Sequence, residues 1–502
     1  MDAAQSVETE RKFDVARPEL SPPLQNLRGV SSVDEPVEHL LEAQYFDSSD
    51  LVLARHRITL RRRSGGEDDG WHLKLPLDDA DSRRELQEPL GTGETPPEAL
   101  VRRISVHLRG RKLVPVVRLS TRRVVHRLRG AGDTVLAEIA DDHVHAEPLL
   151  PGRAGHDWRE WEVELVSGGP DLLDAVQDKF AAAGVHRAGH ASKLARALGS
   201  LNPEPAKPSD RTGSGTAGRM LSAYVNEQVQ ALQEQDPEVR DHVPDAVHQM
   251  RVATRRLRSA LGTQKRLLEA ETTAALRGEL KWLAGVLGEV RDTEVMQERL
   301  LELLATEPQE LVMGPVARRI NEELSAEYSA GYRTLLETMD HKRYFRLLDS
   351  LDEFRTDLPL TAKADEKPKS AAVAIGKDGK RLRKAVKAAR SNRGTPHGDE
   401  SLHEARKAAK RLRYAAEAAA AVDAKHAGRL EQAAHSIQKV LGRHQDSVVA
   451  REVLRRLATE AFMQGENAFS YGRLHALEQG LAAQTETDFY DNWTTFPAKL
   501  LK

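Results

Sequence analysis

The second half of the sequence contains the same basic motif twice. HQMRVATRRLR at residues 248–258 returns as HEARKAAKRLR at residues 403–413, an offset of 155 residues. A second motif, LGEVRD at 287–292, returns as LGRHQD at 441–446, an offset of 154. Two matches at nearly the same offset predict a duplicated helical unit of roughly 150 residues.

The texture of the chain changes near residue 200. Residues 1–200 are broken by Gly, Pro and short alternating runs such as RITLR at 57–61, whereas the remainder is rich in Ala, Leu, Glu and Arg with helical periodicity. Pro, Gly and Ser are concentrated in the stretch between them, as in flexible linkers. We therefore predict an α+β multidomain protein: a β-rich domain over 1–200, a flexible linker over 201–218, and an all-α domain over 219–502.

Composition excludes several classes of function. The 502 residues carry 75 Lys and Arg against 77 Asp and Glu, a net charge of −2, so no global field favours nucleic acid or membranes. The absence of cysteine excludes disulfides and thiolate chemistry and fits a reducing cytoplasm. No apolar run approaches the roughly 18 residues of a membrane span. We expect a cytoplasmic protein with local anion sites and neither a specific nucleic-acid partner nor a membrane partner.

Charged residues alternate with apolar residues in several segments of the first domain. In a strand, alternate side chains share a face, so separate acidic and basic rows are predicted. The acidic rows contain Glu8, Glu10, Glu162 and Glu164, and the basic rows contain Arg57, Arg61, Arg63 and Lys74. One interpretation is a sheet with a charged, solvated outer face. The other is a closed barrel with a charged interior, in which cations hold phosphate oxygens and carboxylates hold Mg²⁺ or Mn²⁺.

The duplicated motif places its cations on one side of each helix. At 100° per residue these side chains fall within about 80° of one another, opposite an apolar face. They are His248, Arg251, Arg255 and Arg258 in the first copy and His403, Arg406, Lys410 and Arg413 in the second. A solvated helix face and metal ligation by the two histidines are alternatives. The recurrence in phase favours two basic helices facing one groove, which the basic run 377–393 extends.

The N-terminal segments resemble the CYTH, or triphosphate tunnel metalloenzyme, family. ETERK at 8–12 matches its ExExK signature, and further segments follow in the family's order. These segments are Tyr45-Phe-Asp47, Leu60-Arg61-Arg-Arg63, Trp71-His-Leu-Lys74, Arg84-Glu85-Leu86, Thr121-Arg-Arg123, Ala137-Glu138-Ile-Ala-Asp141, Glu162-Val-Glu164 and Ser192-Lys193-Leu194. The resemblance implies an antiparallel eight-stranded β tunnel over residues 5–198 that binds a triphosphate and a divalent metal.

The resemblance also implies roles for individual residues. Catalysis would involve Glu8, Glu10, Lys12 and Glu85. The metal, Mg²⁺ or Mn²⁺, would be held by Glu8, Glu10, Glu138, Asp141, Glu162 and Glu164. The triphosphate would be bound by Lys12, Arg57, Arg61, Arg63, Lys74, Arg123 and Lys193. Strand parity does not select Arg123, which rests on the resemblance alone. A transition-metal site at Asp141, His143 and His145 is an alternative for that strand.

The helical half resembles the CHAD domain, over about residues 219–500. The resemblance implies binding of inorganic polyphosphate by the eight residues of the two basic faces. The combined interpretation is a metal-dependent hydrolase of inorganic triphosphate or a related organic triphosphate, with a domain that binds polyphosphate and associates with polyphosphate granules. A class IV-type adenylate cyclase and a non-catalytic polyphosphate receptor that docks to granules are the alternatives. Aromatic residues make up only 4% of the chain, which disfavours stacking on a nucleobase.

Overall fold

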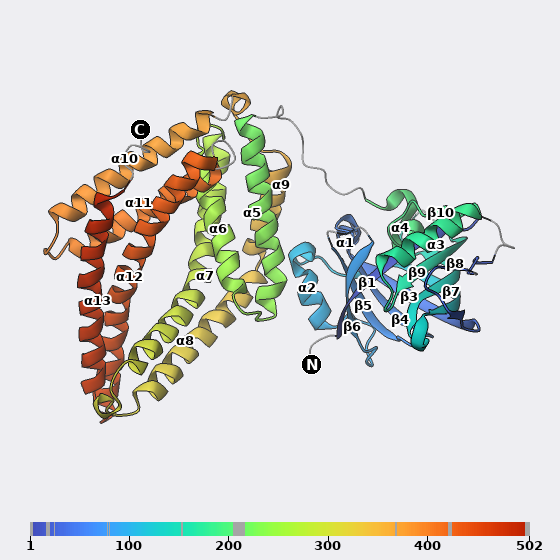
Figure 1. Cartoon of the computed structure of the whole chain (residues 1–502), viewed down its shortest axis with the longest axis horizontal. Coiled ribbons are helices and arrows are strands. Elements are labelled where there is room, and N and C mark those ends of the chain that lie inside the picture. Colours follow the sequence, from blue (N-terminus) through green and yellow to red (C-terminus); the bar gives the residue numbers. More distant parts are fainter. Residues whose placement is uncertain are drawn as a thin grey trace. The chain divides into compact units, whose positions relative to one another are not determined.

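The computed structural model describes residues 4–16, 21–24, 26–77, 79, 81–151, 154–203, 216–366, 369–419 and 424–496. The chain separates into two units, Met1–Lys207 and Pro208–Lys502, each described by itself below (Figure 1). Most of the predicted linker lies outside the described residues, and its last two residues already belong to a helix that begins at Ala217.

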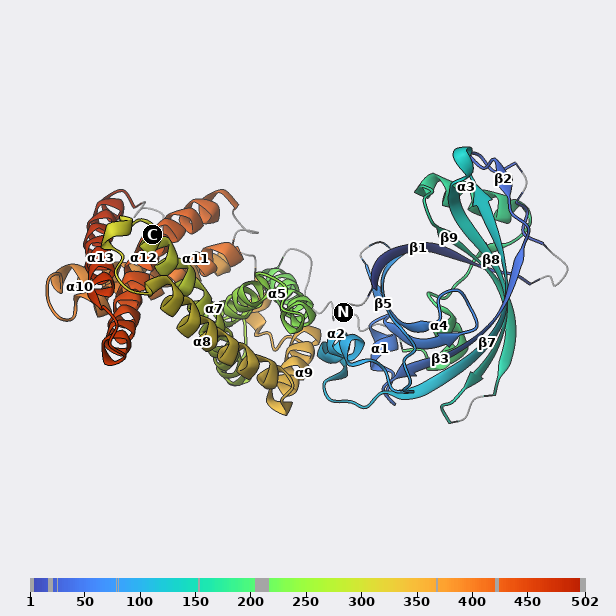
Figure 2. The same ribbon diagram turned by 90° about the horizontal axis from the view of Figure 1, so that it is seen from below.

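The first unit is a closed antiparallel barrel, as predicted. Eight strands follow the order β1-β6-β5-β4-β3-β7-β8-β9, and β9 pairs with β1 to close the ring (Figure 2). The strands are β1 (Ala4–Asp14), β3 (Val37–Asp47), β4 (Thr59–Ser64), β5 (Gly70–Pro76), β6 (Ser82–Glu88), β7 (Val114–Arg129), β8 (Val135–Pro148) and β9 (His156–Leu165). Two-residue strands β2 (Ser32–Val33) and β10 (His186–Arg187) pair with β7 and β1.

Helices cover the apolar outer face that the alternating pattern creates. Phe13 of β1 and Trp161 of β9 pack against Phe180 of α3 (Pro170–Ala182), with ring centroids 4.9 and 4.8 Å apart. On another side, Leu100 of α2 (Glu98–Leu108) joins Trp71 of β5 in a buried cluster with residues of β4, β6 and α1 (Val52–Arg55). The opposite, charged rows of these strands therefore face the interior.

One end of the barrel interior is filled by a short helix. Leu194 and Ala197 of α4 (Lys193–Leu198) pack with Leu119 of β7 and Val144 of β8, which share the inward-facing side of their strands. Ser192 caps this helix by accepting a hydrogen bond from the Ala195 amide, at 3.1 Å. Lys193 therefore begins α4 where the apolar filling meets the charged interior.

The second unit is all-α, and its helices repeat in order. The described helices are α5 (Ala217–Arg240), α6 (Ala246–Thr263), α7 (Ala270–Ala305), α8 (Val316–Met339), α9 (Lys342–Thr356), α10 (Lys369–Ser391), α11 (Gly398–Ala419), α12 (Ala424–Met463) and α13 (Phe469–Thr494). When the residue numbers of α5, α6, α7 and α8 are shifted by the offset of the sequence repeat, they match the ranges of α10, α11, α12 and α13 to within a few residues. Helix α9 is an insertion between the two copies. The predicted duplication is confirmed.

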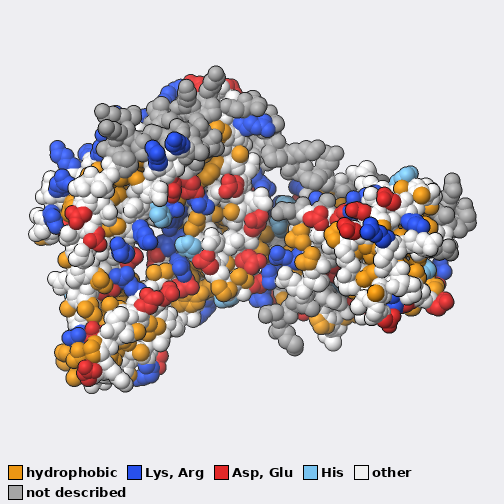
Figure 3. Space-filling view, in the orientation of Figure 1, with side chains coloured by type: hydrophobic (Ala, Val, Ile, Leu, Met, Phe, Trp, Pro, Cys, Tyr) orange, Lys and Arg blue, Asp and Glu red, His pale blue; other side chains and the backbone are white. Residues whose placement is uncertain are grey.

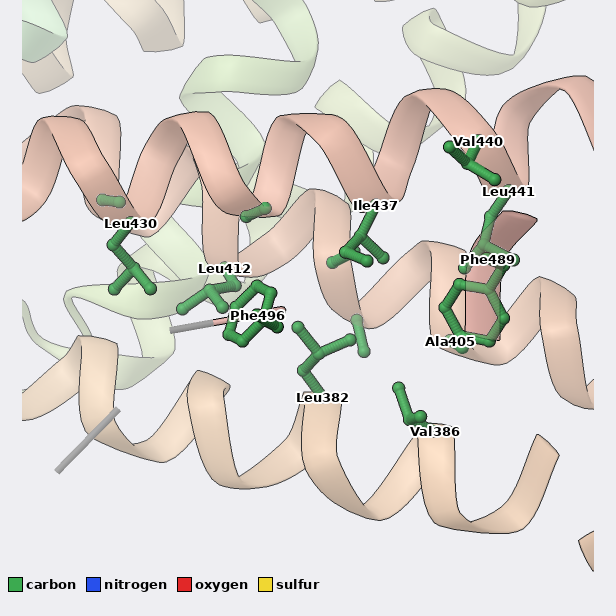
Figure 4. Close-up of a cluster of buried hydrophobic side chains, with 14 of the residues drawn as sticks. Leu382, Val386, Ala405, Leu412, Leu430, Ile437, Val440, Leu441, Phe489 and Phe496 are labelled. Atoms are coloured by element: carbon green, nitrogen blue, oxygen red, sulfur yellow. The ribbon is translucent and has the colours of Figure 1, made fainter. Parts of the chain in front are cut away.

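One buried core belongs to the second copy, and another is shared by the two copies. In the second copy, Leu382 and Val386 of α10 pack with Leu412 of α11 and Ile437 of α12, and all four are at most 2% exposed (Figure 4). The two copies meet where α6 lies against α11, the two helices that carry the duplicated basic motif, and where α7 and α8 share a buried apolar cluster with α12 and α13. Within the described part of the chain, no helix is long and apolar enough to cross a membrane.

Candidate functional site

A charged cavity of about 270 Å³ occupies the interior of the barrel. Its charged side chains come from strands all around the ring and from the start of α4. They are Glu8, Glu10, Lys12, Arg61, Arg63, Lys74, Arg83, Arg123, Arg127, Glu138, Glu162, Glu164 and Lys193, together with Glu67 and Asp68 from the β4–β5 turn. The predicted rows therefore meet in one enclosed space.

The acidic row from β1 lies beside the acidic row from β9. The register pairs Glu10 with Glu164 and Lys12 with Glu162. Lys12 Nζ bridges the two strands, 2.6 Å from Glu10 Oε1 and 2.7 Å from Glu162 Oε1. Burial opposes ionisation of Glu10, but Lys12 and Lys74 outweigh it and lower its pKa to about 2. Both carboxylates are thus held ionised by the lysine between them.

Two carboxylates of the same cavity are compensated less well. Burial raises the pKa of Glu8 to about 8, although Lys74 contacts it. Burial, with the nearby charges of Glu10 and Glu162, also raises the pKa of Glu164. Buried carboxylate oxygens that lack sufficient positive charge are the donor set that a hard divalent cation completes. Glu8 and Glu164 therefore have the chemistry of ligands for Mg²⁺ or Mn²⁺, although no three of the predicted acids Glu8, Glu10, Glu162 and Glu164 form a group with oxygens within 4.8 Å of one another among the described residues.

Another buried acidic cluster lies next to these residues and already has cations. Oxygens of Asp142, Glu160 and Glu162 lie within 4.8 Å of one another, and this is the one such group of three among the described residues. Lys193 Nζ lies 2.5 to 2.9 Å from all three carboxylates. Arg123 adds a two-pronged contact to Asp142, at 2.7 and 2.8 Å. These ion pairs occupy the oxygens and fix Lys193 and Arg123 at the cavity wall.

Arg63, on the basic side of the cavity, is short of negative charge. The Nε atoms of Arg61 and Arg63 are buried and have no hydrogen-bond partner among the described residues. Burial, with Arg61 and Arg123 nearby, lowers the pKa of Arg63 to about 9, although Asp68 contacts it. An anion in the cavity would relieve this crowding, and phosphate oxygens match the geometry of guanidinium groups.

Glu85 of β6 pairs across the sheet with Lys74 and shares its inward face, but it is not among the residues that line the cavity. Its Oε1 is 2.9 Å from His72 Nδ1, 3.8 Å from Lys74 Nζ and 4.0 Å from Arg61 Nη2. Burial opposes ionisation of Glu85, but the His72 hydrogen bond and Lys74 lower its pKa. Its position suits it to orient Lys74 and Arg61 toward the cavity.

Two further predicted barrel residues, Arg57 and Asp141, do not line the cavity either. Arg57 is exposed in a left-handed turn, with φ of 60°, before β4 begins at Thr59, so strand parity does not extend to it. Asp141 of β8 pairs with Trp161 of β9, whose side chain lies in the outer core, so Asp141 also faces outward. Its carboxylate accepts hydrogen bonds from Arg159 at 2.6 and 2.8 Å. Asp142 takes the inward position that was predicted for Asp141.

Sequence reasoning missed several residues of the cavity. Arg83 is buried on β6, and its guanidinium donates to the carbonyls of Arg57 and Ala191 at 3.2 and 2.9 Å. Arg83 lies two residues before Glu85, so the two side chains share one face of the strand. This alternation would have predicted Arg83 as a cavity residue. Arg127 follows Arg123 at the strand spacing and donates to Glu138 at 2.8 Å. Tyr45 and His39 also line the cavity.

The helical unit contains a separate basic groove of about 930 Å³ between its two copies. Figure 3 shows Lys, Arg and His side chains gathered in a hollow between the α6–α7 and α11–α12 pairs of Figure 1. Seven of the eight predicted residues line it, namely His248, Arg251, Arg255, Arg258, His403, Arg406 and Lys410. Further cations that the prediction missed are Arg277, Lys281, Arg291, Arg299, Lys407 and Arg411.

Cations are crowded at the centre of this groove. Burial, with Arg255 and Arg406 as the strongest of several cationic neighbours, lowers the pKa of Lys410 to about 6. Arg255 donates to the Tyr414 hydroxyl at 2.6 Å, and its Nε is buried without a partner among the described residues. A groove lined by so many cations attracts anions from the solution.

Arg413 is the predicted residue that lies outside the groove lining. Its Nε donates to Glu431 of α12 at 3.0 Å, and its guanidinium lies over the Tyr414 ring. Among the described residues no ion pair engages Arg258, so the two copies differ here. The missed cations Arg277, Lys281 and Arg291 lie on one side of α7, the helix that carries the first LGxxxD motif, and a helical wheel of that segment would have shown them.

Comparisons with known proteins agree with this architecture. The CYTH domain family matches residues 6–198, and the CHAD domain family matches residues 223–455. Uncharacterized protein Rv2226 of Mycobacterium tuberculosis is 40% identical over 501 residues, which cover 95% of this chain and 94% of that protein.

Two solved structures are similar to parts of this chain. PptA from Streptomyces chartreusis is 23% identical, with a TM-score of 0.48 over 56% of this chain and 99% of its own. The CHAD domain from the plant Ricinus communis is 26% identical, with a TM-score of 0.45 over 59% of this chain and 98% of its own. From the two domain matches and the full-length relative, the chain belongs to the family of proteins that join an N-terminal CYTH domain to a C-terminal CHAD domain.

Proposed function

We propose that the barrel is a divalent-metal-dependent hydrolase that cleaves the terminal phosphoanhydride of inorganic triphosphate or a related organic triphosphate. The observation that carries this proposal is the pairing, in one enclosed cavity, of buried carboxylates short of cations with buried arginines short of anions. A metal–triphosphate complex supplies both charges at once. A binding protein for phosphate alone would gain nothing from the carboxylates.

We assign metal binding to the acidic residues of the cavity and phosphate binding to its basic residues. Glu8, Glu10, Glu162 and Glu164 would hold Mg²⁺ or Mn²⁺, which when bound neutralises the triphosphate and lowers the pKa of a bound water. Arg61, Arg63, Lys74, Arg123 and Lys193 would bind phosphate oxygens and stabilise charge that develops on the leaving group. Lys12 keeps Glu10 and Glu162 ionised, and Glu85 orients Lys74.

The lining of the cavity favours a substrate without a nucleobase. The lining contains one aromatic side chain, Tyr45, so little stacking surface is offered to a nucleobase. Inorganic triphosphate therefore fits better than a nucleotide, and cyclisation of ATP is the rival activity to be tested.

For the helical unit we propose binding of inorganic polyphosphate in the groove between the copies. The support is the crowding of cations around Lys410, contributed by α6, α7 and α11. An acyclic phosphate chain offers repeated charge without base edges, so cationic side chains suffice to bind it. This domain would bring the barrel to polyphosphate, including polyphosphate granules.

The first experiment compares substrates. The purified chain is incubated with Mg²⁺ or Mn²⁺ and, separately, with triphosphate, ATP, thiamine triphosphate and long-chain polyphosphate, and released phosphate and cyclic AMP are measured. Metal-dependent release from triphosphate is expected. Formation of cyclic AMP would replace the hydrolase with a cyclase, and salt-sensitive polyphosphate binding without any turnover would make the protein a receptor.

Two variants separate the domains. Glu10→Ala is expected to abolish hydrolysis and leave polyphosphate affinity unchanged, while Arg255→Ala with Lys410→Ala is expected to do the reverse. Glu147→Ala, an exposed acid on the outer face of β8, and Arg318→Ala, an exposed cation of α8, are the matched controls. Loss of both properties in either test variant would refute the division of labour.

A further inference from the structure

Helix α10 has one face in the core and another in solvent. Leu382, Val386 and Ala389 are at most 2% exposed and pack into the second copy (Figure 4). On the opposite side, four exposed lysines form a row that we name the lysine band: Lys377, Lys380, Lys384 and Lys387. At 100° per residue they fall within about 80° of one another and extend over about 15 Å of helix.

The lysine band has no acidic counterpart. The run 377–393 contains eight basic residues and one acid, Asp378. That acid is 3% exposed and is already engaged by Arg381 and by Arg411, whose Nε lies 2.9 Å from its Oδ1. No ion pair between described residues includes a lysine of the band. A row of like charges on an ordinary solvated helix usually alternates with acids, and this one does not.

The contacts of Asp378 connect the band to the groove. Arg411 lines the groove on α11 and reaches Asp378 on α10. Arg381 contacts the same oxygen of Asp378, and it lies one helical turn from both Lys377 and Lys384. Arg411 in the groove and Arg381 beside the band therefore share one buried carboxylate, and this shared contact links the two basic surfaces.

We propose that the lysine band binds the continuation of a polyphosphate chain whose first part lies in the groove, so that this protein favours long chains over short ones. This inference rests on the proposed polyphosphate binding by the groove and adds a second contact surface. The band is a linear array of point charges with no aromatic side chain among its members, which suits a bare phosphate chain better than a nucleic acid.

Amine footprinting tests where the chain lies. The intact protein is acetylated with a water-soluble amine reagent in EDTA, which prevents turnover, with no ligand, with tripolyphosphate or with long-chain polyphosphate. Modification is read peptide by peptide. Both ligands are expected to protect Lys410, and only the long chain is expected to protect Lys380, Lys384 and Lys387. Lys342 and Lys425, exposed on α9 and α12, are the internal controls.

Affinity provides the second readout. The triple variant Lys380→Gln, Lys384→Gln, Lys387→Gln should bind long-chain polyphosphate at least about tenfold more weakly at low salt, with the slope of log affinity against log salt lower by about 2, taking 0.7 per contact as for single strands. Affinity for tripolyphosphate should not change. The matched control removes the same charge elsewhere, by Lys342→Gln, Lys363→Gln and Lys425→Gln.

The outcomes separate the two proposals. Protection of Lys410 without protection of the band, or a triple variant that keeps the wild-type affinity and salt slope, would overturn the inference and leave groove binding intact. Equal losses for short and long chains would also overturn it, because they would indicate a general field effect. If neither tripolyphosphate nor long-chain polyphosphate protects Lys410, groove binding itself is refuted. A single-stranded RNA that binds the band as tightly as polyphosphate would refute the assigned partner.

Discussion

Arg251 Nη1 donates a hydrogen bond to Asp292 Oδ1 at 2.7 Å, and this contact joins the two motifs that the sequence repeats. The second copy places Arg406 opposite Asp446, with 4.0 Å between Nη2 and Oδ1. The glycine of the first LGxxxD motif, Gly288, lies directly beside the Arg251 guanidinium. The two motifs therefore form the same contact in each copy, which requires nearly the same number of residues between them in both copies.

The contact places Asp292 in the groove, where Asp446 is the other acid among the lining residues. Asp292→Asn should strengthen polyphosphate binding at low salt by about two- to fivefold, the range of a partly exposed charge pair, because it removes a charge that repels phosphate. Isothermal titration calorimetry measures the effect, and raising the salt concentration should diminish it. Glu322→Gln on α8 is a control for charge alone. Weaker binding of Asp292→Asn would instead mean that positioning of Arg251 outweighs the repulsion.

Lys410 makes polyphosphate binding depend on pH. Burial and its cationic neighbours lower its pKa to about 6, so the free groove holds this amine largely neutral above pH 7. Bound phosphates stabilise the ammonium form, and binding therefore takes up a proton. Affinity should rise as the pH falls from 8 toward 6, by at most tenfold per pH unit for one proton. Lys410→Arg stays charged, so its pH dependence should be smaller, and the difference isolates Lys410 from His248 and His403.

The same residue affects stability in a defined direction. A lysine in the unfolded chain has a pKa near 10.4, well above about 6 in the folded state. Between these values the unfolded state binds more protons, so stability rises with pH, and the cost of charging Lys410 is present in full only below about pH 6. Lys410→Met should therefore raise the melting temperature more at pH 6 than at pH 9. An equal shift at both values would contradict the lowered pKa.

Period-two alternation accounts for most of what the sequence predicts about the barrel. Glu8, Glu10 and Lys12 face inward together because strand geometry leaves no other arrangement. The error at Asp141 came from departing from that rule: Glu138 lies three residues earlier and faces inward, so both residues cannot share a face. Arg57 failed because the start of β4 depends on a left-handed turn that parity does not reveal.

Tertiary contacts decide the rest. The helical wheel places Arg413 in phase with Arg406, and Glu431 on another helix nevertheless binds it away from the groove. The filling of one barrel end by α4 is likewise a long-range packing event. Lys193 contacts Asp142, which comes from a distant segment of the chain. No repeating sequence pattern connects the two residues, so the role of Lys193 could be expected only from the family resemblance.

Glu164 provides a test of the metal site. Glu164→Gln keeps the shape of the side chain but removes a charged ligand, so the Mg²⁺ concentration for half-maximal triphosphate hydrolysis should rise at least about tenfold. Activity measured against Mg²⁺ concentration, at saturating triphosphate, gives this value. Glu147→Gln, on the outer face of β8, should leave the curve unchanged. A variant with the wild-type Mg²⁺ requirement would remove Glu164 from the metal site.

Leu382 anchors α10, and with it the lysine band, to the second copy. Leu382→Ala removes a fully buried side chain from the cluster of Figure 4 and should cost about 2–5 kcal/mol of helical-unit stability. Denaturant unfolding measures this cost, and Val449→Ala, at an exposed apolar site on α12, is the control. Because the barrel has its own cores, triphosphate hydrolysis should persist at denaturant concentrations that unfold the helices of the variant. Loss of hydrolysis together with the helical transition would mean that the two units unfold as one.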